Sequence, residues 1–495
     1  MINSAVAILS VLLVCVATVL IAINGLRLSR TTGDFYVASR TVKPWWNASA
    51  IGGEYLSAAS FLGIAGLIVV SGQDGLWFPI GYTAGYLMLL LFVAAPLRRS
   101  RAYTIPDFAQ IRLGSMTLRR LTSFLVVVIC WLYIVPQLHG ASLTLGISTG
   151  LPGWLGSVLV MGIVCVTVLA GGMRSITFVQ AFQYWLKLAA LAIPVVFLLL
   201  HLSVIGESAT LDGAVFDRGT GSGANKGLYY NISLLVALLF GTLGLPHVLV
   251  RFYTNPDGPS ARKTTAIVLG LLALFYIFPT ILGVLGRAYT PELAISGNAD
   301  ATVLLLPGRI LGGTAAGDAL TAIIIGGAFA AFLSTSSGLV VSLAGTISQD
   351  LFRGTVRGFR ISTVIATVVP LLVALGTSSL ALAGAIGSVF AFTAATICPL
   401  LLLGIWWRGL SVAGAISGML TGAISCGVSL GLASVLPNEP GSMHALLAQP
   451  AAWCVPLAFL VMITVSLATR RSTPARIDAV MARLHVPEAR LDTLP

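Results

Sequence analysis

A glutamate follows two glycines inside a segment apolar enough to cross a membrane. Residues 49–60 read SAIGGEYLSAAS, and Glu54 is the only acidic residue deep within an apolar run of that length. Glycine weakens a helix, and a carboxylate surrounded by hydrocarbon is costly. The combination predicts an interrupted helix whose carboxylate neutralises a cation, takes up a proton or hydrogen-bonds the free amides at the break.

A lysine supplies a second charge at membrane depth. Lys187 follows Ser175 by twelve residues, which is about 18 Å along a helix and near the middle of its span. An ionisable residue at this depth marks a functional site by default. Its ammonium can take the place of a bound cation; alternatively, it extends along Tyr184 and Trp185 toward the interface or pairs with an acid.

The composition places both charges in a membrane protein. The chain has 495 residues, of which 57% are hydrophobic and 9% charged, whereas soluble domains average about 25% charged residues. The six cysteines have no paired spacing, so neither a disulfide framework nor a metal knuckle is indicated. No phosphate-binding loop or HExxH motif is present, and we expect no enzymatic activity.

Apolar stretches of membrane-spanning length recur thirteen times and fix a topology. We predict spans at residues 4–26, 45–70, 76–97, 121–147, 153–171, 178–203, 229–251, 264–286, 316–347, 361–379, 381–406, 410–435 and 449–469. Of the 28 basic residues, 23 fall on one side of these spans, which the positive-inside rule makes cytoplasmic. The N-terminus is then outside and the C-terminus inside. The net charge of +12 reflects these loops rather than binding to nucleic acid.

The spans divide into two units of five with matching interruptions. We assign residues 1–30 to an extra N-terminal helix, 45–203 and 229–406 to two repeats, 410–469 to two further helices and 470–495 to a cytoplasmic tail. An odd number of spans inverts the second repeat relative to the first. The first helix of each repeat carries helix breakers, Gly52–Gly53 in one and GTLGLPH (241–247) in the other. These predict two broken helices around a binding site; alternatively, the small residues only permit close packing.

Paired breaks of this kind suit two ligands at once. Carbonyl oxygens freed at a break are ligands for a hard cation. The N-terminal ends of half-helices present N–H groups to an anion. A channel would instead need a polar stripe or charged ring along several spans, and none is present.

Three motifs resemble the sodium/solute symporter family, and within it the cation/acetate branch. They are EYLSAASFLGIAGLIVVSGQDGL (54–76), GTLGLPHVLVRFYT (241–254) and AFLSTSSGLVVSLAGTISQDL (331–351). The resemblance implies an all-α integral membrane protein of about thirteen helices, with a leucine-transporter-like inverted repeat of five plus five helices. It also implies cation-coupled uptake at the plasma membrane. We expect a single chain to be functional, and a membrane sensor is an alternative role.

The resemblance also implies a sodium site. Its ligands would be backbone carbonyls of Gly53, Leu56 and Ala331 and the hydroxyls of Ser334 and Thr335. Serine and threonine in apolar helices also bond their own carbonyls, which is the alternative for this pair. Proton coupling through Lys187 or Glu54 is the alternative to sodium.

The substrate residues follow from the two breaks and the third core helix. We predict Glu54, Ser57, Ser60, Trp131, Gln137, Thr242, Gly244 and His247. No arginine is expected mid-span to hold a carboxylate bidentately. The resemblance favours a small monocarboxylate such as acetate, with pyruvate, propionate or an amino acid as alternatives. At the cytoplasmic side, Asp107 and Asp350 lie among arginines, and we hypothesise salt bridges there.

Overall fold

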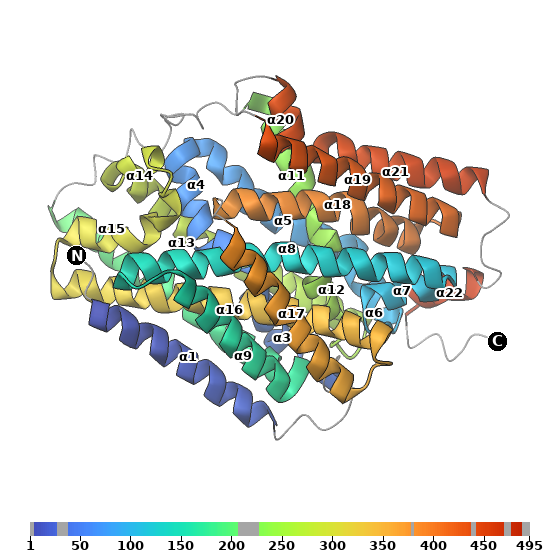
Figure 1. The fold of residues 1–495 in the computed structure, drawn as a ribbon, viewed down its shortest axis with the longest axis horizontal. Helices are drawn as coiled ribbons and strands as arrows, with labels where there is room; N and C mark the ends of the chain where they lie inside the picture. The colour runs from blue at the N-terminus through green and yellow to red at the C-terminus, as the bar shows by residue number, and fades with distance from the viewer. Residues whose placement is uncertain are drawn as a thin grey trace.

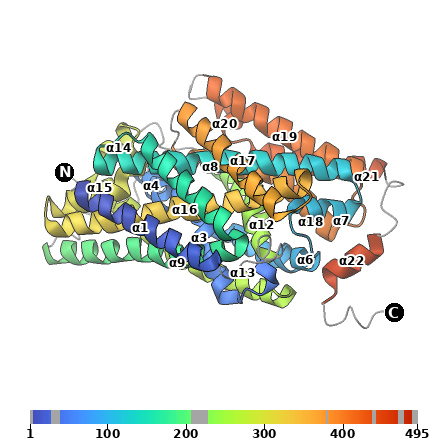
Figure 2. The same ribbon diagram turned by 60° about the horizontal axis from the view of Figure 1, so that its bottom comes forward.

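The computed structural model describes residues 4–26, 38–205, 227–377, 381–436, 442–469 and 477–487. These residues are helical or in short connections, and they contain no strand. The long helices are α1 (Ser4–Leu26), α5 (Trp77–Phe92), α8 (Met116–Thr149), α9 (Trp154–Ile205), α13 (Gly258–Tyr289), α16 (Ala315–Leu351), α17 (Val356–Gly376), α18 (Leu382–Trp406), α19 (Val412–Val435) and α21 (Ala451–Ala468). They form a bundle with α16 near its centre and α1, α19 and α21 at its edges (Figure 1, Figure 2).

The predicted spans correspond to these helices. Eleven helical stretches of the described chain are long and apolar enough to cross a membrane. One of them, α9, contains the predicted spans 153–171 and 178–203, which are separated where Gly172 leaves helical geometry with φ 55° and ψ −148°. Another stretch, Ala59–Phe92, overlaps the second half of the predicted span 45–70 and most of the predicted span 76–97.

Burial distinguishes the core helices from those that face lipid. In the apolar stretch of α18 that could cross a membrane, 83% is buried inside the protein, compared with 33% in that of α1. Because lipid tails are as apolar as a protein core, α1 keeps large hydrophobic side chains on its outer surface. The centre of the bundle therefore lies among α8, α9, α16 and α18, where the functional residues are found.

Both predicted helix breaks are present. Helix α3 (Pro44–Tyr55) ends before Leu56, which has φ −73° and ψ 86°. A π-helical turn, η2 (Ala59–Gly63), then leads into α4 (Ile64–Ser71). In the second repeat, α11 (Gly227–Gly244) and α12 (Pro246–Phe252) are separated at Leu245, with φ −64° and ψ 115°.

The first break is not at the glycine pair. Gly52 and Gly53 are helical residues of α3, and the interruption follows at Leu56. A Cβ atom at Gly52 would lie 2.8 Å from the Tyr184 ring, and one at Gly53 would overlap the Gln180 carbonyl. The pair therefore permits the close packing of α3 on α9, which was the alternative interpretation of these glycines.

Many basic residues lie in short helices at one end of the bundle, which we call the basic end. Here lie α6 (Ala94–Arg99), α7 (Ile105–Leu113) and α22 (Ile477–His485), as Figure 1 shows. Arg112 of α7 donates to the Gly404 carbonyl at 2.7 Å and the Trp407 carbonyl at 2.9 Å. It thereby satisfies free carbonyls at the end of α18. Burial lowers the pKa of Arg112 to about 10.

Candidate functional site

The ammonium group of Lys187 lies within the predicted cation site. Lys187 belongs to the second half of α9 and is fully buried. Its Nζ donates to the Gly53 carbonyl, to the Leu56 carbonyl at 2.7 Å and to the Ser334 hydroxyl at 3.0 Å. Three of the five predicted sodium ligands are therefore hydrogen-bonded to a lysine.

The other two predicted sodium ligands form hydrogen bonds with groups other than Lys187. The Ala331 carbonyl accepts from the Ser334 hydroxyl at 3.1 Å. The Thr335 hydroxyl donates to the Glu54 carbonyl at 2.7 Å. This bond ties α16 to the last turn of α3. The Ser334 hydroxyl thus donates to a carbonyl of its own helix, as serines in apolar helices commonly do, and also accepts a hydrogen bond from Lys187.

Glu54 forms a buried ion pair with Arg251 of α12. Arg251 Nε donates to Glu54 Oε2 at 2.6 Å, and both side chains are at most 2% exposed. The same guanidinium donates through Nη1 to the Thr177 hydroxyl at 2.8 Å and through Nη2 to Gln180 Oε1. Glu54 therefore neutralises an arginine and joins α3, α12 and α9.

Gln180 connects this ion pair to the lysine site. Its Nε2 donates to the Ser334 carbonyl at 2.7 Å and to the Ser337 hydroxyl at 3.3 Å. Ser334 accepts one hydrogen bond from Lys187 on its hydroxyl and one from Gln180 on its carbonyl. A continuous hydrogen-bonded network thus runs from Lys187 through Ser334 and Gln180 to Arg251 and Glu54.

Arg251 was misassigned by sequence reasoning. It falls on the last residue of a predicted span, and the positive-inside count placed it with the loop charges. The structure instead buries it completely. The signal that would have found it is the need of Glu54 for a counter-charge, because a buried carboxylate is rarely left unpaired.

The predicted substrate residues at the first break surround its free backbone. Ser57 is buried, and the Ser60 hydroxyl lies 3.2 Å from that of Tyr276. Gln137 Oε1 accepts from the Ala58 N–H at 2.9 Å. This bond satisfies a donor that the helix break leaves without a backbone partner. Trp131 is partly buried, and its indole N–H has no partner.

At the second break the predicted residues have three different roles. The Thr242 hydroxyl donates to the Leu238 carbonyl at 2.6 Å and contacts the Tyr55 hydroxyl at 3.1 Å. Gly244 packs closely on Thr393, so it permits helix contact. His247 is buried with neither ring nitrogen hydrogen-bonded.

Sequence reasoning missed the aromatic cluster that lies between the breaks. It consists of Tyr55, Tyr82, Tyr86, Tyr133, Tyr276 and Phe390, with His247 at its edge. The Tyr55 ring lies 4.5 Å from that of Tyr86 and 5.7 Å from that of Tyr82. Tyrosines are frequent in membrane helices at the lipid interface, so composition did not distinguish these.

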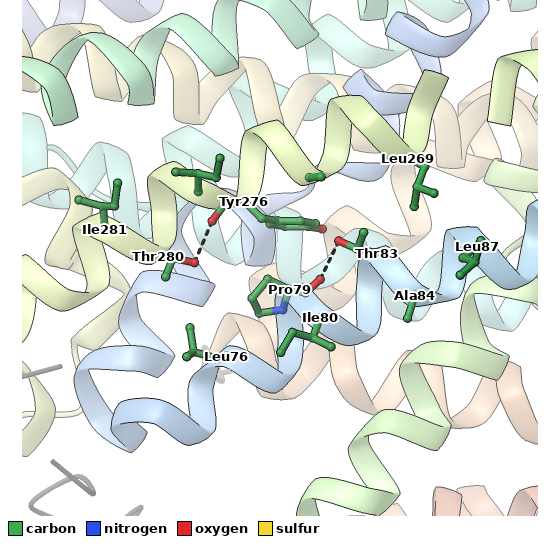
Figure 3. Close-up of a pocket in the computed structure, with 12 residues that line it drawn as sticks. Leu76, Pro79, Ile80, Thr83, Ala84, Leu87, Leu269, Tyr276, Thr280 and Ile281 are labelled. Atoms are coloured by element: carbon green, nitrogen blue, oxygen red, sulfur yellow. Dashed lines mark hydrogen bonds between the residues drawn. The ribbon is translucent and has the colours of Figure 1, made fainter. Parts of the chain in front are cut away.

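One side of the cluster borders an apolar surface groove between α5 and α13 (Figure 3). The groove has a volume of about 740 Å³ and Tyr276 forms part of its wall. Its two threonines bond backbone carbonyls of their own helices, Thr83 to Pro79 and Thr280 to Tyr276, each at 2.8 Å. With these hydroxyls already engaged, the groove is suited to apolar contacts rather than to a carboxylate.

The hypothesised salt bridges at the basic end are present. Arg119 Nη1 lies 2.8 Å from Asp107 Oδ1, and Arg119 Nε lies 2.7 Å from Asp350 Oδ1. Asp350 also accepts from the Ser123 hydroxyl. One arginine thus joins α7, α8 and the end of α16.

Comparisons with known proteins agree with this architecture. The sequence model of the sodium:solute symporter family matches residues 35–422. The chain is 31% identical to "Uncharacterized symporter YwcA" of Bacillus subtilis (strain 168), with 90% of each protein covered. It is 29% identical to "Monocarboxylic acid transporter" of Corynebacterium glutamicum, over 93% of this chain and 91% of that protein.

Solved structures share the fold at low sequence identity. A Na⁺-coupled sialic acid symporter in a substrate-bound, outward-open state superposes with a TM-score of 0.71 at 14% identity, covering 93% of this chain and 98% of the other. Mhp1, a nucleobase-cation-symport-1 family transporter in a closed conformation, gives 0.56 at 16% identity, covering 91% and 98%. The fold is the leucine-transporter-like one that the family resemblance implies. The match over residues 35–422 and the 31% identity to a symporter establish that this chain belongs to the sodium:solute symporter family.

Proposed function

We propose that the protein is a cation-coupled symporter that takes up a small monocarboxylate by alternating access. The family supports symport, and the relative named as a monocarboxylic acid transporter supports the substrate class. Arg251, which the structure places beside Glu54, is not available to clamp the substrate, because it is already bonded to Glu54, Thr177 and Gln180. A two- to four-carbon acid, held by hydroxyl and amide donors, suits such a site.

The contacts of Lys187 favour the proton as the coupling ion, and this observation carries the proposal. A protonated lysine offers hydrogen-bond donors to the oxygens at which the family resemblance places sodium. Protonation would then hold α3, α9 and α16 together as sodium does in that scheme. Loss of the proton would remove the charge and weaken the contacts to Gly53, Leu56 and Ser334.

The buried charges support the same choice. Lys187 and Arg251 carry two positive charges and Glu54 one negative charge, and each is at most 1% exposed. With Lys187 protonated, this network has a net charge of +1, which one monocarboxylate anion would neutralise. A sodium ion beside the charged lysine would leave the network more positive, and uncompensated buried charge is costly. We therefore propose electroneutral uptake of one proton with one carboxylate.

Sodium remains the second candidate. The family and the Na⁺-coupled sialic acid symporter favour it. The oxygen set at Gly53, Leu56, Ala331, Ser334 and Thr335 has the chemistry that a hard cation prefers. Sodium at this place would require Lys187 to be neutral or to turn away from these oxygens.

We further propose that the basic end faces the cytoplasm of the cell and that the N-terminus is outside. The whole network lies within one chain, which supports a functional monomer. The assignment of residues 45–203 and 229–406 to inverted repeats fits the positions of the two breaks, at Leu56 and Leu245.

Uptake into proteoliposomes tests the function. Radiolabelled acetate and pyruvate are offered under an imposed proton gradient or sodium gradient. Protein-free vesicles are the control, because undissociated acetic acid crosses lipid unaided. The proposal predicts protein-dependent accumulation driven by the proton gradient. Accumulation driven by sodium alone would assign the coupling to the second candidate, and no uptake of either acid would reject the substrate class.

A further inference from the structure

Several buried polar groups in and beside the aromatic cluster have no hydrogen-bond partner. The hydroxyls of Tyr82 and Tyr86, the Nε2 amide of Gln137 and both ring nitrogens of His247 are unpartnered. All four residues are at most 2% exposed. A buried polar group without a partner costs about 1–3 kcal/mol. Four such residues in one place point to a ligand that accepts hydrogen bonds.

The elements of the cluster bring these donors together. Tyr82 and Tyr86 are four residues apart on α5 and therefore share one face of that helix. Tyr133 and Gln137 have the same spacing on α8. The Tyr133 ring lies 5.2 Å from that of His247 and 6.0 Å from that of Phe390. Phe390 in turn lies 5.1 Å from Tyr82, which joins the two helices around one centre.

The cluster adjoins the lysine site at the same helix break. Gln137 bonds the Ala58 N–H, whereas Lys187 bonds the Leu56 carbonyl two residues earlier. An anion beside Gln137 would therefore lie close to the ammonium group. The remaining donors are neutral, so they would fix the position of an anion while Lys187 balances its charge.

From these contacts we propose that Tyr82, Tyr86 and Gln137 bind the carboxylate of the substrate, and that the rings of Tyr133 and Phe390 limit the length of its chain. This assignment rests on the proposed monocarboxylate transport. His247 lines the same place at the start of α12. The close ring contacts, between 4.5 and 6.4 Å, favour a short acyl chain over a sugar.

Removal of single hydroxyls tests the assignment, with KM and maximal rate measured for acetate and pyruvate. Tyr82→Phe and Tyr86→Phe keep the ring and remove only the donor. A hydrogen bond to a charged group corresponds to a change in KM of about 10- to 100-fold. The matched control is Tyr229→Phe, whose hydroxyl donates to the Gln449 carbonyl at 2.7 Å, away from the cluster. Its KM should stay within about two-fold of the wild type.

Two further variants keep the test decisive. Gln137→Glu retains an acceptor for Ala58 N–H but replaces the amide donor by a carboxylate, so uptake should be lost while the protein remains folded. Phe390→Ala should admit monocarboxylates of five or six carbons that the wild type rejects. Unchanged KM values in both tyrosine variants, with normal wild-type transport, would overturn this assignment alone. Failure of the wild type to transport any monocarboxylate would overturn the proposed function as well.

Discussion

The Lys187 ammonium donates to the Ser334 hydroxyl at 3.0 Å, in the interior of the protein and next to the break in the first core helix. The bond joins α9 to α16. The same ammonium bonds the Gly53 and Leu56 carbonyls of α3. A single protonatable group thus holds together three helices, which the proposed alternating access would move relative to one another.

The hydroxyl pair on α16 should be needed for coupling. Ser334→Ala combined with Thr335→Ala removes one acceptor of Lys187 and the bond from Thr335 to the Glu54 carbonyl. We expect uptake to lose its dependence on the coupling cation while the protein stays folded. Uptake at several proton and sodium gradients checks this. Ser417→Ala is the control, since that hydroxyl bonds only the Ala413 and Gly414 carbonyls of its own helix. Unchanged cation dependence in the double variant would remove these two residues from the site.

The buried ion pair between Glu54 and Arg251 should contribute strongly to the stability of α3 and α12. Arg251→Met leaves Glu54 buried without its partner, and such losses cost about 3–5 kcal/mol. Glu54→Leu added to Arg251→Met should recover part of this loss, because no unpaired charge then remains. Thermal unfolding in detergent measures both.

An exposed pair provides the control for that series. Arg309 and Glu292 lie 2.7 Å apart with side chains 56% and 50% exposed. Arg309→Met should therefore cost less than about 1 kcal/mol. Equal losses for Arg251→Met and Arg309→Met would mean that the buried pair has no special role.

The space beside Glu54 depends on a glycine of α16. A Cβ atom at Gly338 would overlap the Glu54 carboxyl group. Gly338→Ala should therefore lower the melting temperature and the uptake rate. A Cβ atom at Gly270 in α13 would have no atom within 4 Å. The control variant Gly270→Ala should therefore leave the melting temperature unchanged or raise it slightly. A Gly338 variant as stable and active as the Gly270 variant would show that the carboxyl group can move aside freely.

A carboxyl group outside the basic end should make stability depend on pH. Asp300, in the short helix η5 (Ala299–Ala301), accepts from the Leu382 N–H at 2.9 Å. Burial raises the pKa of Asp300 from 3.8 to about 6. The folded state therefore holds this proton where the unfolded chain has lost it, so stability falls as pH rises from about 4 through 6.

The variant Asp300→Asn tests this titration. The amide keeps an oxygen acceptor for Leu382 and has no charge to bury. Because Asp300 is partly exposed, we expect a gain on the order of 1 kcal/mol at pH 7.5 and no gain at pH 4. Melting temperatures across this range measure the difference. A variant whose pH profile parallels that of the wild type would assign the dependence to other groups.

Local patterns predicted the spans and the second break, because each rests on the residues of one segment, but they placed the first break a few residues too early. Hydropathy marks a span, and Pro246 with its glycine neighbours marks an interruption. Lys187 was identified by its depth, but its partners were not. Contact with Gly53 depends on how α9 is rotated against α3, which one sequence does not specify.

The ion pair and the tyrosines were beyond sequence reasoning for physical reasons. Glu54 and Arg251 are 197 residues apart, and Arg251 lies at the end of a span, where arginine is ordinary. A tyrosine that faces the centre of a bundle has the same local sequence as one that faces lipid. Only packing distinguishes Tyr82, which is buried without a hydroxyl partner, from a residue at the membrane interface.

The central claim is that Lys187 carries the coupling proton, and Lys187→Met tests it most directly. Vesicles containing the variant are compared with wild type in two measurements, exchange of labelled pyruvate at equal pH and accumulation under a proton gradient. We predict that the variant still exchanges pyruvate, with a raised KM, and no longer accumulates it. Accumulation by the variant at the wild-type level under the same gradient would contradict the account.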